Sequence, residues 1–191
     1  MTAPGATPVA GERATAEMLI ALSRRYLREY LTKIRLAVSV LDDDIIWARP
    51  NESSNSIGNL MLHLSGNARQ WIVSGVGGAA DIRDRQSEFD QRAPLPATSL
   101  IDWLEQTVTD VDRVLASLTS ADLYSRRTIQ ANDVSVLEAV YHVVEHFSMH
   151  TGQIILLAKS KQPDRIRFYD MVDGHPQLIT DFDGRTPIHP R

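Results

Sequence analysis

Residues 135–161, SVLEAVYHVVEHFSMHTGQIILLAKSK, predict a long helix that carries most of the candidate chemistry of the chain. Ser135 is a favoured N-cap residue, and Pro163 stops a helix, so the sequence marks both ends. Apolar residues cover most of the helix circumference and leave only a narrow sector near Glu138 and Glu145 suited to water. A helix of this kind is buried on most of its sides. We therefore expect it to pack against several other helices.

Three further segments repeat apolar residues at helical spacing. We expect helices over residues 14–41, over residues 55–74 beginning at Asn55 or Ser56, and over residues 98–118 beginning at Thr98 or Ser99. No segment shows a convincing strand pattern. Four long helices predict an all-α fold with the topology of an up-and-down four-helix bundle.

The remaining segments are expected to be irregular. Residues 1–13 are typical of a loose N-terminal arm, residues 14–162 should form the bundle, and residues 163–191 should form an irregular tail packed on it. Residues 79–97 are charged and contain two prolines, which favours a long loop with room for one helical turn. Residues 119–134 are expected to be a simple connection.

Composition excludes several functional classes. The chain has no cysteine, which excludes disulfides, thiolate metal sites and cysteine nucleophiles. Its 191 residues suit one domain, and a net charge of −4 without a basic stripe argues against nucleic acid as a partner. No run approaches the roughly 18 apolar residues of a membrane helix, and the N-terminus lacks a secretory signal. We expect a cytoplasmic protein that binds no membrane.

Three histidines follow one another at four-residue spacing: His142, His146 and His150. Neighbours in this row lie on one helix face roughly 6 Å apart, so two imidazoles can share a cation. The outer two are about 12 Å apart, which is too far for one ion to take all three. The spacing predicts a metal-binding pair, either 142 with 146 or 146 with 150. The competing interpretation is that such pairs arise by chance and face solvent or cap neighbours.

His63 is the other histidine inside a predicted helix. A polar strip surrounds it, and this strip fits either a solvated face or a wet internal site; periodicity does not separate the two. The remaining histidines, His175 and His189, are expected at the surface. The members of the strip around His63 are Ser56, Asn59, Asn67 and Gln70.

A rival interpretation uses His142 and His146 differently. With Glu145 they fit H-x-x-E-H, a zinc peptidase signature in which two histidines bind zinc and the glutamate acts as base. Such peptidases need a further acidic ligand, but no Glu follows residue 146. The chain is also short for a protease that encloses its substrate. A zinc peptidase therefore ranks third, after a metal-dependent transferase or hydrolase and a non-catalytic bundle.

Two segments together resemble the DinB-like superfamily, bacterial four-helix proteins described as metal-dependent hydrolases. They are NSIGNLMLHLSGN at residues 55–67 and EHFSMHTGQIILLAK at residues 145–159. The most specific feature of this resemblance is a combination of two motifs. The second helix has a single histidine, and the fourth has H-x-x-x-H followed directly by a small residue, Gly and Gln. The resemblance covers most of residues 14–161.

The spacing of the histidines leaves two possible metal-binding pairs, and the resemblance implies which residues are the ligands. The three metal ligands of the superfamily fall on His63, His146 and His150. His142 then becomes an additional histidine that supports the ligands. The superfamily commonly has Arg directly after the last ligand, where this chain has Thr151.

Three neutral imidazoles do not offset the double positive charge of a divalent cation, and they leave some of its coordination positions vacant. Imidazole ligation suits zinc or nickel, and also iron, and three protein ligands are typical of a catalytic zinc site. The expected activity is that of a metal-dependent hydrolase, which activates water, or of a thiol S-transferase, which activates a small-molecule thiol to attack an electrophile. Characterised branches of the superfamily include thiol transferases, so the resemblance favours the thiol. Gln153 and Asn59 are candidate orienting groups, and no residue stands out as a general base.

Two further expectations concern catalysis and assembly. The alternative to an enzyme is a non-catalytic helical bundle with a structural metal or an interaction role. The helix over residues 135–161 is too apolar for an outer wall, which predicts a homodimer built on part of its surface.

Overall fold

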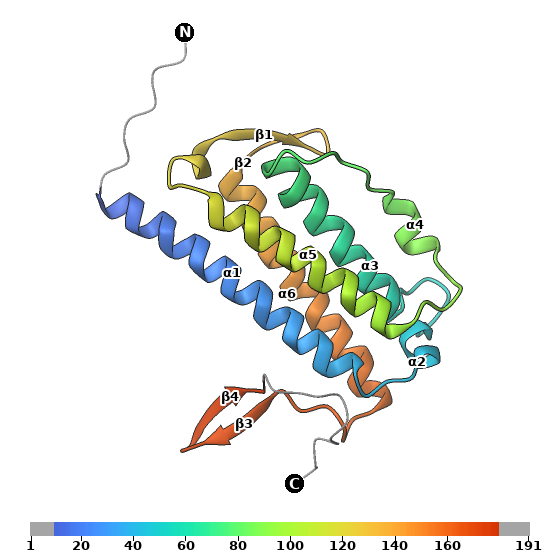
Figure 1. Ribbon diagram of the computed structural model, residues 1–191. Helices are drawn as coiled ribbons and strands as arrows, with labels where there is room; N and C mark the ends of the chain where they lie inside the picture. The colour runs from blue at the N-terminus through green and yellow to red at the C-terminus, as the bar shows by residue number, and fades with distance from the viewer. Residues whose placement is uncertain (1–9, 180–191) are drawn as a thin grey trace.

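Four long helices dominate the computed structural model of the chain, which describes residues 10–179 (Figure 1). Helix α1 packs on α5 and α6, and α3 packs on the same two helices, so each long helix touches two others. The apolar core lies between them. The prediction of a mostly helical fold is confirmed. The long elements are α1 (Ala10–Val38), α3 (Ile57–Ala68) with its π-helical continuation η1 (Arg69–Val76), α5 (Ala97–Ser117) and α6 (Val136–Lys161).

Polar caps determine where these helices begin. Ser56 and Ser135 each form a reciprocal capping box, with Asn59 and Glu138 respectively, so the predicted starts of α3 and α6 are correct. Helix α5 differs, because it begins at Ala97, ahead of the predicted Thr98 or Ser99. The backbone N–H of Ala97 donates to the Asp43 carboxylate, a cap distant in sequence that a local pattern does not reveal.

Three short helices join the long ones: one lies in the segment 79–97, where one helical turn was expected, one in the predicted connection 119–134, and one between the first two predicted helices. Helix α1 also begins inside the predicted arm, and residues 1–9 of that arm lie outside the described part of the chain. Every helix in residues 10–179 is too short or too polar to cross a bilayer. The short helices are α2 (Asp43–Trp47), α4 (Arg85–Asp90) and the 3₁₀ turn η2 (Asp122–Tyr124).

Two antiparallel hairpins make the all-α prediction wrong in detail. One lies in the predicted connection 119–134 and the other in the predicted irregular tail (Figure 1). Their four-residue strands are mostly exposed and therefore lack the alternation of apolar residues that marks a half-buried strand. The strands are β1 (Arg126–Ile129) with β2 (Asn132–Ser135), and β3 (Tyr169–Val172) with β4 (His175–Leu178).

The two hairpin turns differ in how visible they are in the sequence. Each has two central residues with positive φ, at Gln130 and Ala131 in the first hairpin and at Asp173 and Gly174 in the second. Asp-Gly is a strong signal for such a turn, and the sequence analysis overlooked it. Gln-Ala is not such a signal, so the first hairpin could not be found from its turn.

Candidate metal centre

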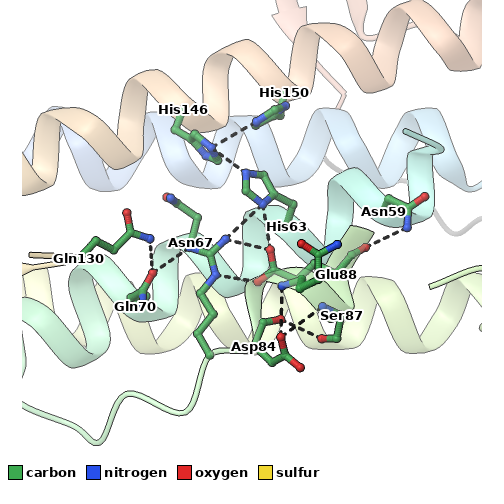
Figure 2. Close-up of polar contacts among 12 residues, drawn as sticks. Asn59, His63, Asn67, Gln70, Asp84, Ser87, Glu88, Gln130, His146 and His150 are labelled. Atoms are coloured by element: carbon green, nitrogen blue, oxygen red, sulfur yellow. Dashed lines mark hydrogen bonds and ion pairs between the residues drawn. The ribbon is translucent and has the colours of Figure 1, made fainter. Parts of the chain in front are cut away.

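Three imidazoles from two helices converge between α3 and α6. The Nε2 atom of His146 lies 3.1 Å from Nε2 of His63 and 3.2 Å from Nε2 of His150. One nitrogen from each of the three rings lies within 4.8 Å of the others. Figure 2 shows His63 rising from α3 toward the other two rings on α6. His63 and His146 are buried, and His150 is half-buried.

The outer nitrogens of two of these rings are already engaged. Nδ1 of His63 lies 2.9 Å from Oε2 of Glu88, and Nδ1 of His150 lies 2.6 Å from Oε1 of Gln153. Both partners are acceptors, so each Nδ1 carries the proton and donates it. The Nε2 atoms of His63 and His150 therefore both direct a lone pair at His146.

A cation fits this arrangement of nitrogen atoms. His146 carries at most one proton on Nε2, although two lone pairs face it, and its buried Nδ1 has no hydrogen-bond partner among the described residues. Metal–nitrogen bonds of about 2.0–2.1 Å place neighbouring ligand nitrogens about 2.8–3.4 Å apart for octahedral to tetrahedral angles. The two measured separations lie in that range. Two of the three nitrogen pairs thus have the spacing of metal ligands, and the third lies within 4.8 Å, so the three residues form a candidate site for a divalent cation.

Burial keeps His146 and His150 neutral, the form that ligates metal. Burial, followed by the nearby charges of His150, His63, His142 and Arg83, lowers the pKa of His146 to about 3. Burial also lowers the pKa of His150, against an opposing effect of its hydrogen bond to Gln153.

Helix α4 brings a carboxylate to the site that the sequence analysis did not anticipate. Burial by itself would raise the pKa of Glu88, but hydrogen bonds from Arg83 and His63 and the charge of Arg83 lower it below its usual value. Glu88 is therefore ionised. Arg83 Nη2 also lies 3.1 Å from Nδ1 of His63, but Arg only donates, and the Nδ1 proton belongs to the bond with Glu88. The ring of Phe89 covers His63, with centroids 4.8 Å apart.

A weak signal for α4 is present in the sequence. The Asp84 side chain accepts hydrogen bonds from the backbone of Gln86 and Ser87, which makes it an N-cap within the charged segment 79–97. The burial of Glu88 has no such signal, since glutamate in a charged segment usually faces water.

Of the two residues predicted to orient the ligands, Gln153 and Asn59, only Gln153 contacts a histidine. Gln153 contacts His150 directly. Asn59 touches no histidine and instead binds the backbone oxygens of Glu88 and Gln91, so it holds α4 in place (Figure 2). Thr151, which replaces the common arginine of the superfamily, is buried.

His142 lies beside the three-histidine group but outside it. Its Nε2 atom is 3.3 Å from Nδ2 of Asn67, and its ring packs against that of Trp71 at a tilt of 37°, with centroids 4.1 Å apart. The other residue of the peptidase signature, Glu145, is exposed, so the geometry gives that interpretation no support. His175 is exposed in β4, as expected, and His189 lies outside the described residues.

A groove lies one helical turn from the histidines. Its volume is about 320 Å³, within the range of small-ligand sites. The polar loop after Pro50 forms one wall, and Leu60 and Leu156 form apolar parts of the others. Because Gln153 also lines the groove and contacts His150, the groove borders the candidate metal centre.

Several solved structures share this fold, and two of them show how far the likeness extends. One is a DinB-like protein from Bacillus cereus, 19% identical, which aligns over 75% of this chain and 91% of its own with a TM-score of 0.60. The other is a conserved protein from Enterococcus faecalis, 15% identical, which aligns over 73% of this chain and 94% of its own, also with a TM-score of 0.60. At these identities the likeness establishes the fold alone. No curated protein matches the chain significantly.

A protein family matches most of the chain. Residues 14–174 match DUF1572, described as a protein of unknown function, and this match includes all three converging histidines as well as Glu88. DUF1572 is a DinB-like family, so the resemblance seen in the sequence is confirmed. The chain belongs to the DUF1572 family, within the DinB-like proteins.

Proposed function

We propose that this protein is a metal-dependent enzyme built on a DinB-like up-and-down four-helix bundle, and that His63, His146 and His150 hold one divalent cation, zinc or nickel. The observation that carries the proposal is the convergence of three Nε2 atoms, two of them on rings whose Nδ1 proton is already donated elsewhere. Structural zinc sites use four protein ligands, whereas three ligands with an open position are typical of catalysis.

The charges around the site favour an anionic reactant. Three neutral imidazoles leave the charge of the cation intact, and the charge of Glu88 is balanced by Arg83. When bound, such a cation lowers the pKa of water or of a thiol and so supplies a nucleophile at neutral pH. Gln153 orients His150, and Phe89 shields His63 from water.

The proposed reaction is transfer of a small-molecule thiol to an electrophile, with hydrolysis as the variant in which water takes the place of the thiol. The resemblance to thiol transferases supports the thiol. The groove beside Gln153, the residue that contacts His150, offers apolar walls for the body of the electrophile. The proposed setting is the cytoplasm, which is rich in such thiols.

Activity assays test this proposal against a non-catalytic bundle. Untagged protein loaded with zinc or nickel would be assayed with low-molecular-weight thiols against a panel of electrophiles, and with ester and amide substrates without thiol. We expect metal-dependent turnover in the thiol panel and its loss in His146→Ala. Protein that binds metal and remains inactive in both panels would favour a structural metal instead.

We also propose a homodimer formed through the outer face of α6. Large apolar side chains are exposed along this face, and the charged residues Glu138 and Glu145 lie among them. A second copy of the same face would cover them, as in a two-fold dimer. Sedimentation at micromolar concentration should show a dimer, and Leu156→Glu should shift it to monomer; wild-type monomer at that concentration would contradict the proposal. The exposed residues are Leu137, Tyr141, Met149 and Leu156.

A further inference from the structure

Two side chains that reach Nδ1 of His63 come from outside the helices that carry the histidines, Glu88 and, at 3.1 Å, Arg83. Glu88 Oε2 lies 2.9 Å from this nitrogen, and Arg83 donates to both oxygens of the same carboxylate, at 2.7 Å and 2.8 Å. The side chains of Arg83 and Glu88 are only 4% and 9% exposed. The Arg83 guanidinium, the Glu88 carboxylate and the His63 imidazole therefore form a buried chain of polar contacts. Its last member, His63, directs Nε2 at His146.

We propose that Glu88 is a positioning residue for the metal centre. It holds His63 in the tautomer with the proton on Nδ1, which leaves the Nε2 lone pair free for the cation, and Arg83 fixes the carboxylate in turn. A neutral imidazole otherwise takes either tautomer, and a carboxylate hydrogen-bonded to a ligating histidine is a general means of orienting the ring. This inference rests on the proposed function.

The position of Glu88 is set by the fold and not by His63. Asn59 donates to the backbone oxygens of Glu88 and Gln91, at 2.8 Å and 3.1 Å. Arg49 donates to Asn59 and to the backbone oxygen of Phe89, at 2.7 Å and 3.0 Å. These bonds attach α4 to the start of α3 through groups that do not touch a histidine. The carboxylate is thus held in place before any cation is bound.

Gly66 provides the space that the carboxylate occupies. It lies on α3 three residues after His63, and a Cβ atom here would lie 1.9 Å from Oε1 of Glu88 and 3.0 Å from Nε of Arg83. The obstructed atom is the end of a flexible side chain, so alanine would displace the carboxylate while the helix stays in place. Gly66→Ala therefore removes the contact but keeps every polar group of the site.

The pairing with Arg83 also has a consequence for the charge of the site. Glu88 alone would offset part of the positive charge of the cation through His63. Because the guanidinium balances the carboxylate, the pair orients the ring without neutralising the centre. The preference of the open position for an anion is therefore retained.

Nitrogen-15 NMR of the metal-free protein and zinc titration against a chelator test this inference. In wild type we expect His63 to carry its proton on Nδ1. Glu88→Ala and Gly66→Ala should lose that tautomer preference and bind Zn²⁺ about 10- to 100-fold more weakly. Glu88→Gln retains an acceptor oxygen, so it should fall between wild type and Glu88→Ala.

Asp112→Asn is the matched control. Asp112 on α5 accepts from Arg24 and Arg28 on α1, so the change weakens a partly buried arginine–carboxylate cluster whose hydrogen bonds involve no histidine. We expect it to leave both the His63 tautomer and the Zn²⁺ dissociation constant unchanged.

An unchanged tautomer with an unchanged Zn²⁺ dissociation constant in Glu88→Ala and Gly66→Ala would overturn the positioning role and leave the proposed function intact. Wild type that binds no Zn²⁺ would contradict the proposed function instead. The tautomer is measured without metal, so it still decides whether Glu88 holds His63. If Glu88→Ala does not fold, Gly66→Ala decides alone.

Discussion

His146→Ala is expected to abolish tight metal binding, whereas His142→Ala is expected to retain it. The Nε2 atom of His146 is within 3.2 Å of the corresponding atoms of both other ligands, so it stands at the centre of the donor set. His142 instead contacts Asn67 and Trp71. Isothermal titration of untagged, chelator-treated proteins with Zn²⁺ measures the difference.

The two variants are a matched pair, since both remove a histidine from the same face of α6. The loss in His146→Ala should exceed the roughly 10- to 100-fold cost of removing a supporting residue, and His142→Ala should stay within that cost. Equal loss of affinity in both variants would show that the pair 142 and 146 binds the ion. Such a result would restore the alternative that the spacing of the three histidines leaves open.

Zinc is expected to raise the melting temperature of the protein strongly. A ligand that binds only the folded state at 1,000 times its Kd adds about 4.1 kcal/mol to the free energy of unfolding. For a chain of this size each kcal/mol corresponds to about 2–4 °C, so the expected rise is roughly 8–16 °C. Differential scanning calorimetry with and without saturating ZnCl₂ measures it.

Two controls make this thermal measurement specific. Mg²⁺ prefers oxygen ligands, so the same concentration of MgCl₂ should leave the melting temperature unchanged. His146→Ala should show no zinc-dependent rise. An equal rise with zinc in this variant would mean that zinc stabilises the fold through other groups.

The sequence predicts the helical framework because helix signals are local. Ser56 and Ser135 precede their helices and bind backbone N–H groups three residues later, which is visible within one turn of sequence. The start of α5 depends instead on Asp43, distant in the chain, and was placed too late. The hairpins were missed because their strands are exposed and so have no apolar alternation.

For the candidate site, the sequence predicts the histidines but not their surroundings. Four-residue spacing restricts the metal-binding pair on α6 to 142 with 146 or 146 with 150. The family resemblance adds His63 and selects the pair with His150. The partner of His63 depends on how α4 folds back onto α3, through bonds from Asn59 to backbone oxygens about thirty residues later. No local pattern encodes that contact, so Glu88 and Arg83 became visible only in three dimensions.

The central claim is that His63, His146 and His150 bind one divalent cation together. Elemental analysis of untagged protein, followed by Zn²⁺ and Ni²⁺ titration of chelator-treated protein, tests it most directly. We predict one ion per chain in the titration of wild type and none in His63→Ala. Wild type that contains no metal and binds neither ion would contradict the claim.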